Sequence, residues 1–321
     1  MSRTVAEKKI NFKIKNNMKK HSTWKKVISY RQLYLMALPA FIYYVIFHYI
    51  PIYGVTVAFK DFSFVHGITG SEWVGLEYFK FMFSGNAFYR VFSNTFILGI
   101  LKICFGFPIP VIFALLLNEI RHVRFKKMIQ TTSYLPHFLS WVILGGMFLQ
   151  IFSIHGPLNA LFEFLGMEKI SFLTNPQRFR VLLVATHIWK SMGWNSIIFL
   201  AAIASIDTQM YEAAVIDGAG RIKRMIHITL PSILPIIIIM FILSVGNIIK
   251  DDFDQIFNLY NPAVYSTADV ISTYVYRQGL EQMNFSYAAA VDLFKNIIAL
   301  ILVFTSNTIA NKLDDEGYGI W

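Results

Sequence analysis

The sequence predicts an all-α polytopic membrane protein with about six transmembrane helices. Hydrophobic residues make up 55% of the 321 residues and charged residues only 15%, whereas about a quarter of the residues in a soluble domain are charged. The mean hydropathy is +0.51. The apolar residues gather in six runs, most of them close to the roughly 20 residues that a helix needs to cross a bilayer. These runs cover 33–59, 94–117, 138–152, 181–204, 231–249 and 291–309.

The first and third runs need separate justification. The first is expected to remain in the mature protein, because about 30 largely polar residues precede it and no small-residue cleavage site closes it. The third is short, and Pro136, Gly145 and Gly146 blur its ends. Cys104, in the second run, is the single cysteine, so the chain can form neither an intrachain disulfide nor a thiol-ligated metal site.

Lysine and arginine set the orientation of the spans. Ten of the 29 lie in the first 31 positions, which favours a basic anchor beside anionic lipid over binding to nucleic acid. With the N-terminus inside, 18 fall in inner segments and eight in outer segments. The positive-inside rule therefore predicts that both termini, the loop 118–135 and the loop 205–230 are cytoplasmic. The domains expected are a basic N-terminal segment 1–32, a transmembrane domain 33–310 and a tail 311–321.

The loop 205–230 is the most informative segment, because it is polar and lies between two apolar runs. Gly218 and Gly220 interrupt a stretch that otherwise favours helix, so two short helices joined at a glycine bend are expected. Thr229 is expected to cap the next helix, with Pro231 in its first turn. The loop thus leads directly into the fifth run, and its position predicts a protein-docking element.

In this loop Glu212, Ala213 and Ala214 precede Gly218, and Ile228, Leu230 and Pro231 follow it. This pattern resembles the EAA signature of permease subunits of binding-protein-dependent ABC importers. The residues that carry this resemblance, including the neighbours that resemble the carbohydrate-uptake branch, are Glu212, Ala213, Ala214, Asp217, Gly218, Ala219, Ile228, Leu230 and Pro231. Pro235 and the stretches 73–79 and 94–95 also resemble that branch. Three further stretches, 105–108, 134–141 and 254–262, resemble the subfamily that imports complex oligosaccharides and polysaccharide fragments.

The resemblance implies a division of labour in a bacterial cytoplasmic membrane. Two permease subunits form the path, two ATPase subunits bind ATP and Mg, and an external solute-binding protein delivers the oligosaccharide. A second, related permease is expected as partner in preference to a homodimer. The chain contains no GxxxxGK[ST] loop, so it is expected to be a transport subunit with no cofactor of its own and no enzymatic activity. Transport would proceed by alternating access, with the loop 205–230 docked on an ATPase subunit.

Polar groups within or beside the spans are the candidates for the substrate path, because ionisable groups in lipid usually face a protein interior or a wet cavity. The candidates are Trp189, Lys190, Trp194, Asn195, Asn247, Asp251, Asp252, Asp254, Gln255 and Asn296. Contacts between helices, or a solvated helix end, explain the same residues. Asp292 and Lys295 are expected to pair on one helix face, while Lys102 and Gln150 look isolated.

The remaining segments leave alternatives open. His48, His137, His155, His187 and His227 show no metal-ligand spacing, so no metal site and no chemistry is assigned to them. The outer segments 60–90 and 250–290 are the surfaces expected to be available to a binding protein. Two other functions stay open: an importer of a non-sugar solute, and a membrane enzyme that processes glycans. The enzyme needs a cluster of catalytic charges, and only 250–255 comes near one.

Overall fold

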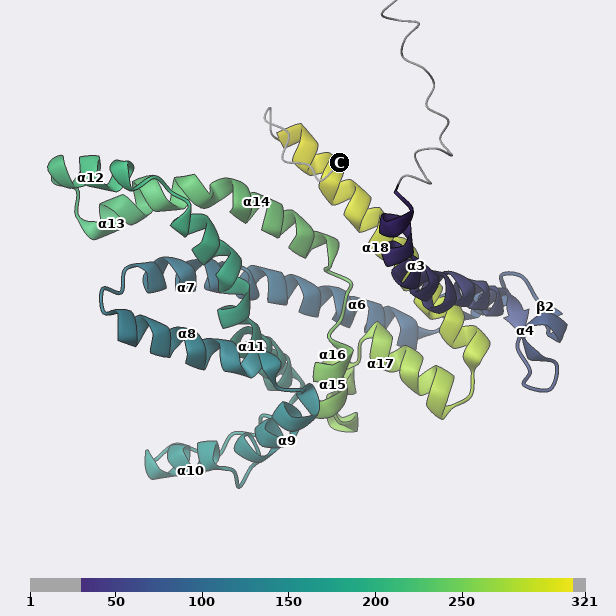
Figure 1. Cartoon of the computed structure of the whole chain (residues 1–321). Coiled ribbons are helices and arrows are strands. Elements are labelled where there is room, and N and C mark those ends of the chain that lie inside the picture. Colours follow the sequence, from purple (N-terminus) through teal and green to yellow (C-terminus); the bar gives the residue numbers. More distant parts are fainter. Residues whose placement is uncertain (1–29, 314–321) are drawn as a thin grey trace, which may run out of the picture. The chain divides into compact units, whose positions relative to one another are not determined.

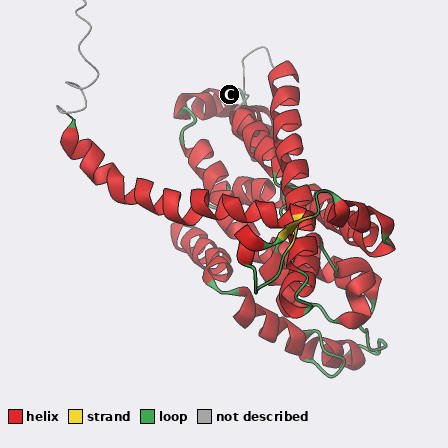
Figure 2. Cartoon of the chain, turned by 90° about the vertical axis from the view of Figure 1, so that its right-hand side faces the viewer, coloured by secondary structure: helices red, strands yellow, loops and turns green. Residues whose placement is uncertain are grey.

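The computed structural model describes residues 30–313 of the chain. It confirms the all-α prediction: the only strands within that range are β1 (Lys60–Asp61) and β2 (Glu72–Trp73), an antiparallel pair. Figure 2 shows this pair, in yellow, among the helices. The predicted segments 1–32 and 311–321 lie largely outside the described residues, so the predicted domain boundaries stay predictions.

The chain separates into two compact units, residues 1–56 and 57–321. The described part of the first unit is a helix made of α3 (Arg31–Tyr44), the π turn η1 (Val45–Tyr49) and most of the 3-10 stretch η2 (Ile50–Phe59). None of the residues of α3 is buried. The helical stretch Arg31–Phe59 is long and apolar enough to cross a membrane, and it matches the first predicted run.

The second unit contains the other helices, which Figure 1 colours from blue to yellow. In chain order the α-helices are α4 (Gly67–Gly70), α5 (Glu77–Ser84), α6 (Asn86–Leu101), α7 (Pro108–Asn118), α8 (Val123–Phe138), α9 (Trp141–Ile151), α10 (Pro157–Phe164), α11 (Pro176–Ala204), α12 (Thr208–Ile216), α13 (Arg221–Arg224), α14 (Leu230–Gly246), α15 (Phe253–Leu259), α16 (Tyr265–Ala268), α17 (Ile271–Tyr276) and α18 (Phe285–Leu313). Three π turns, η3 (Lys102–Gly106), η4 (Met225–Thr229) and η6 (Arg277–Glu281), and a 3-10 turn, η5 (Pro262–Val264), join some of them.

The membrane helices agree with the predicted number of spans. Four helices of the described chain are long and apolar enough to cross a bilayer, and six spans result if each of two bent helix pairs is one span. The four are Arg31–Phe59, Asn86–Asn118, Arg221–Gly246 and Phe285–Thr308; the pairs are α8 with α9, bent by 104°, and α11 with α12, bent by 71°. Long α11 packs against α7 and α8, and α14 packs against α18.

The prediction of a loop at 118–135 is wrong, because most of this segment is helix α8. The charges near its start favour an exposed loop, but they do not represent the rest of the segment. Arg124, Lys126 and Lys127 all lie in the first turns of α8, whereas the rest of the helix carries no Asp, Glu, Lys or Arg and packs against α11. A backbone contact brings the two helices together: a Cβ on Gly193 of α11 would overlap the carbonyl oxygen of Ser133. The predicted run 138–152 is therefore only the second arm of a bent pair.

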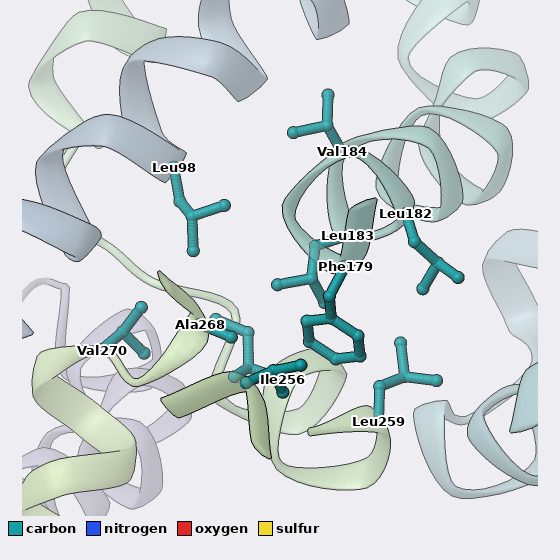
Figure 3. Packing of buried hydrophobic residues seen from close by; sticks show 10 residues of the cluster. Leu98, Phe179, Leu182, Leu183, Val184, Ile256, Leu259, Ala268 and Val270 are labelled. Atoms are coloured by element: carbon teal, nitrogen blue, oxygen red, sulfur yellow. The ribbon is translucent and has the colours of Figure 1, made fainter. Parts of the chain in front are cut away.

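The segment 250–290 was expected to be an outer surface, but much of it is in the core. Figure 3 shows Phe179 and Leu183 of α11 pointing toward Ile256 and Leu259 of α15. These side chains belong to one cluster of buried residues, which also takes in Val270, just before α17. Burial of this apolar face brings α15 against α9 and α11. The polar residues beside it are thereby carried into the bundle.

Candidate functional site

The segment 207–231 begins with a capped helix. The Asp207 side chain accepts a hydrogen bond of 2.9 Å from the backbone N–H of Gln209, which starts α12. Because α12 turns away from α11 by 71°, it leaves the direction of the span. Figure 1 shows α12 and α13 together at one end of α11 and α14. In α12, Glu212 and Ala213 are exposed and Ala214 is half-buried.

Gly218 ends α12 in a Schellman motif. Its φ is +75°, a left-handed conformation that favours glycine. The N–H of Gly218 donates to the carbonyl of Val215 at 3.0 Å, and the N–H of Ala219 donates to that of Ala214 at 2.8 Å. Exposed Asp217 precedes the glycine. The predicted glycine bend is therefore confirmed, with α12 as the short helix before it, whereas α13 after the bend is the start of a longer helix.

After the bend the chain runs as one helix, Arg221–Gly246, through α13, η4 and α14. Pro231 lies at the start of α14, as predicted, and the preceding π turn removes the conflict between its ring and a regular helical bond. Ile228 and Leu230 are half-buried. Leu230 packs beside the buried cluster that joins α7, α11 and α14.

The predicted cap at Thr229 is wrong. Thr229 is in helical conformation, and its side chain makes no capping hydrogen bond, because the helix does not begin there. Its hydroxyl is instead 2.9 Å from the hydroxyl of Tyr211, and the residue is only 1% exposed. This hydrogen bond ties α12 to the long helix at a second point besides the Gly218 bend.

We call residues 207–231, for which the resemblance predicts docking on an ATPase subunit, the coupling segment. Its outer surface is unusually apolar for a polar stretch: Ile216 is 86% exposed and Ile222 is 68% exposed. Met210, Val215 and Ile226 are exposed as well. Charges of both signs lie between them. Exposed apolar side chains rimmed by charges are typical of a surface that another protein covers.

A second group of candidates lies around the bend between α8 and α9. The ring of Trp194 stacks on that of His137, with centroids 4.4 Å apart and the planes 1° from parallel. The ammonium of Lys190 donates to the carbonyl of Leu139 and lies 5.0 Å from the centre of the Trp141 ring.

On α11, Trp189 and Trp194 are each 41% exposed, and Asn195 is exposed. The region thus combines open aromatic faces with polar groups. Sugars bind to such a combination through stacking and hydrogen bonds.

The acidic candidates between α14 and α15 are not a free polar face. Asp251 pairs with Lys295 of α18 at 2.8 Å, and Asp252 pairs with Lys102 of η3 at 2.6 Å. His187 Nδ1 of α11 is 2.8 Å from the same carboxylate oxygen of Asp252. Burial raises the pKa of Asp252, but the hydrogen bond from His187 and the positive charge of Lys102 hold that pKa well below its ordinary value.

These contacts correct the predictions for Lys102 and Lys295 and give His187 a partner that the sequence did not indicate. Lys102 is not isolated, His187 belongs to a charged network, and Lys295 bonds to Asp251 instead of Asp292. Asp292 accepts a hydrogen bond from Asn296 at 3.1 Å. The reason is common to all three, because partners 44 to 150 residues apart in the sequence meet only in the folded bundle.

The remaining candidates differ in burial. Gln255 is 0% exposed and donates to the Leu183 carbonyl at 2.7 Å, so it is part of the core. Asn247, Asp254 and Asn296 are exposed, and Gln150 is exposed too. Among residues 30–313, no group of three or more His, Cys, Asp or Glu side chains is placed to hold a metal ion.

Comparisons with known proteins agree on one family. Residues 82–315 match the family described as binding-protein-dependent transport system inner membrane component. The chain is 44% identical over 293 residues to the polygalacturonan/rhamnogalacturonan transport system permease protein YteP of Bacillus subtilis (strain 168), covering 91% of each protein. It is 46% identical over 286 residues to protein LplB of the same organism, covering 89% of this chain and 90% of that protein.

A solved structure is similar over most of the chain. A chain of a bacterial alginate ABC transporter, in complex with an alginate pentasaccharide-bound periplasmic protein, superposes with a TM-score of 0.83. The two sequences are 37% identical, and the match covers 91% of this chain and 98% of that one. The bundle described above therefore has the arrangement of a solved importer subunit.

Proposed function

The chain belongs to the family of binding-protein-dependent transport system inner membrane components, and from that premise we propose that it imports oligosaccharides by alternating access. Subunits of this family are non-enzymatic transport components of the inner membrane. A solute-binding protein would deliver the sugar outside. Two ATPase subunits would bind ATP and Mg inside, and a second, related permease would complete the path. The excess of Lys and Arg on one side supports cytoplasmic termini.

The observation that carries the coupling role is the continuity of the coupling segment with a membrane helix. Its exposed apolar side chains lie on α12 and α13, and α13 runs without a break into α14. The hydrogen bond between Tyr211 and Thr229 holds α12 against the same helix. A partner that binds α12 and α13 and moves would therefore move α14 with them. Glu212, Asp217 and the exposed basic residues around them would set the orientation of the partner.

The relatives support a polysaccharide-derived cargo. One is named for the transport of polygalacturonan and rhamnogalacturonan, and the solved relative is a transporter of alginate. In this chain Trp189 and Trp194 offer exposed rings, and Lys190 and Asn195 lie beside them on α11. We place the sugar contact here, with Asn247, Asp254 and Asn296 as further exposed polar residues of the path.

The docking proposal is tested by copurification. The full chain is expressed with its ATPase and its permease partner, and the amount of ATPase that elutes with it is compared among variants. Glu212→Lys reverses a charge on α12, so recovery of the ATPase should fall severalfold. Glu168→Lys makes the same change at an exposed residue after α10 and should have no effect. Equal recovery for both variants would contradict the docking role.

The cargo is tested by uptake into proteoliposomes that hold the complete importer, supplied with its solute-binding protein. Oligogalacturonates and neutral oligosaccharides of equal length are compared, and a non-sugar solute serves as the third arm. Trp194→Ala should lower sugar uptake, whereas Phe164→Ala, at an aromatic residue of α10 that is 85% exposed, should not. Uptake of neither sugar would contradict the proposed cargo.

A further inference from the structure

Residues 247–252 connect α14 to α15, and we call them the joint. They follow directly after Gly246, the last residue of the helix that starts in the coupling segment at Arg221. That helix has 26 residues, so it places the joint roughly 39 Å from its start. The joint thus follows the C-terminal end of the helix that the ATPase would move, at the end away from the coupling segment.

Asp251 ties the joint to α17 and α18. Its carboxylate accepts hydrogen bonds from the backbone N–H of Ser272 at 2.8 Å, from the Ser272 hydroxyl and from Lys295 at 2.8 Å. Lys295 also donates to the Ser272 hydroxyl at 2.6 Å, so the three groups form a closed triangle. The Asp251 side chain is 4% exposed. A carboxylate so buried stays with its cation, because separation leaves both charges desolvated.

Asp252 ties the joint to other helices. One of its oxygens is 2.6 Å from Lys102 Nζ in η3 and 2.8 Å from His187 Nδ1 in α11. Lys102 also donates to Gln255 Oε1 at 2.9 Å, and the amide of Gln255 donates to Thr186 of α11 at 2.9 Å. Two consecutive carboxylates therefore hold two separate groups of helices.

The backbone of the joint is also enclosed. A Cβ on Gly99 of α6 would overlap the carbonyl oxygen of Ile248. A Cβ on Gly246 would lie 3.2 Å from the Val303 side chain of α18. The joint cannot slide freely past α6 or α18, so a displacement of α14 has to be transmitted or blocked there.

We propose that Asp251 and Asp252 are positioning residues for transport. They join the C-terminal end of the helix Arg221–Gly246 to α17 and α18 on one side and to η3 and α11 on the other. The inference rests on the proposed function, because it takes α14 as the helix that the ATPase moves. It goes beyond docking, since it assigns the transmission of the α14 movement to neighbouring helices to two carboxylates. These carboxylates contact neither ATP nor the ATPase. Without them, α14 moves while the sugar path stays still.

The test measures sugar uptake per ATP hydrolysed by the complete importer in proteoliposomes. Asp251→Asn and Asp252→Asn should each lower this ratio by about tenfold or more, since each breaks the ion pair that connects the joint to neighbouring helices. The amount of assembled complex and its ATP hydrolysis should persist. Glu168→Gln, which removes an exposed carboxylate after α10, should leave the ratio unchanged.

A paired variant guards against misfolding. Asp251→Asn combined with Lys295→Met removes both charges, so no unpaired charge remains and the complex should assemble. We expect it to hydrolyse ATP with poor uptake. A normal ratio in this variant overturns the proposal. So does loss of assembly in the single and paired variants alike, which assigns the network to folding only.

The two proposals fail differently. A wild-type importer that hydrolyses ATP but takes up no oligosaccharide contradicts the proposed cargo, and the joint with it. A wild-type importer that transports normally, beside Asp251 and Asp252 variants with the same uptake per ATP, contradicts the joint alone. Intact uptake by Glu168→Gln beside a reduced ratio in both aspartate variants supports both proposals.

Discussion

Replacing Gly218 by alanine isolates the bend of the coupling segment from every other effect. The residue has φ +75°, and a Cβ built on it would have no other atom within 4 Å. The substitution therefore introduces no clash with other residues and removes no side-chain contact. It changes only the conformational preference of the residue between α12 and α13, where an L-residue resists the left-handed conformation.

The magnitude follows from that conformation. An alanine in the left-handed region is less stable by about 1–2 kcal/mol than in a helical one. The free coupling segment of the variant relaxes, and docking must restore the bend. Because about 1.4 kcal/mol corresponds to a factor of ten in affinity, binding of the ATPase should weaken by roughly 5- to 30-fold.

The matched control is Gly166→Ala. Gly166 also has φ +75° and open space around its Cβ, and it ends α10 with the same pair of backbone hydrogen bonds, Gly166 to Glu163 and Met167 to Phe162. The dissociation constant of the ATPase for the permease complex in nanodiscs is measured for both variants. Only Gly218→Ala should weaken binding. Equal affinities of both variants and the wild type refute the reasoning that the bend prepares the docking surface.

Three further predictions test the packing. Gly193→Ala pushes a methyl group into the backbone of α8 and should lower the melting temperature of the complex, whereas Gly146→Ala, at a helical glycine with open space, should leave it equal or higher; the reverse order would contradict the close approach. Tyr211→Phe removes the hydrogen bond to Thr229 of η4, about 1 kcal/mol, and should speed amide hydrogen exchange in α12 severalfold; unchanged exchange would argue against this contact. Asp269→Asn breaks the ion pair of a fully buried carboxylate with Arg277, and should destabilise the fold by about 3–5 kcal/mol in thermal unfolding; a loss under 1 kcal/mol would mean the pair is solvated.

Local chemistry made the coupling segment predictable. The bend at Gly218 depends on a residue that tolerates φ > 0, so it was readable from a few neighbouring residues. Thr229 was misread, because its role depends on Tyr211, which approaches it only after α12 folds back. The loop expected at 118–135 failed for a similar reason: three charges in its first turns concealed a helix that packs on α11.

By itself the sequence determined that the protein lies in a membrane, where most of its spans are, and which segment resembles an ATPase-docking element. Each of these depends on hydrophobicity, on charge counts or on backbone preferences within about one turn. Tertiary structure alone decided which charges pair. Asp251 and Asp252 are adjacent in the chain, yet they hold Lys295 and Lys102 from different helices. Which charged side chains pair depends on their distance in the folded bundle, and no spacing along the chain records that distance.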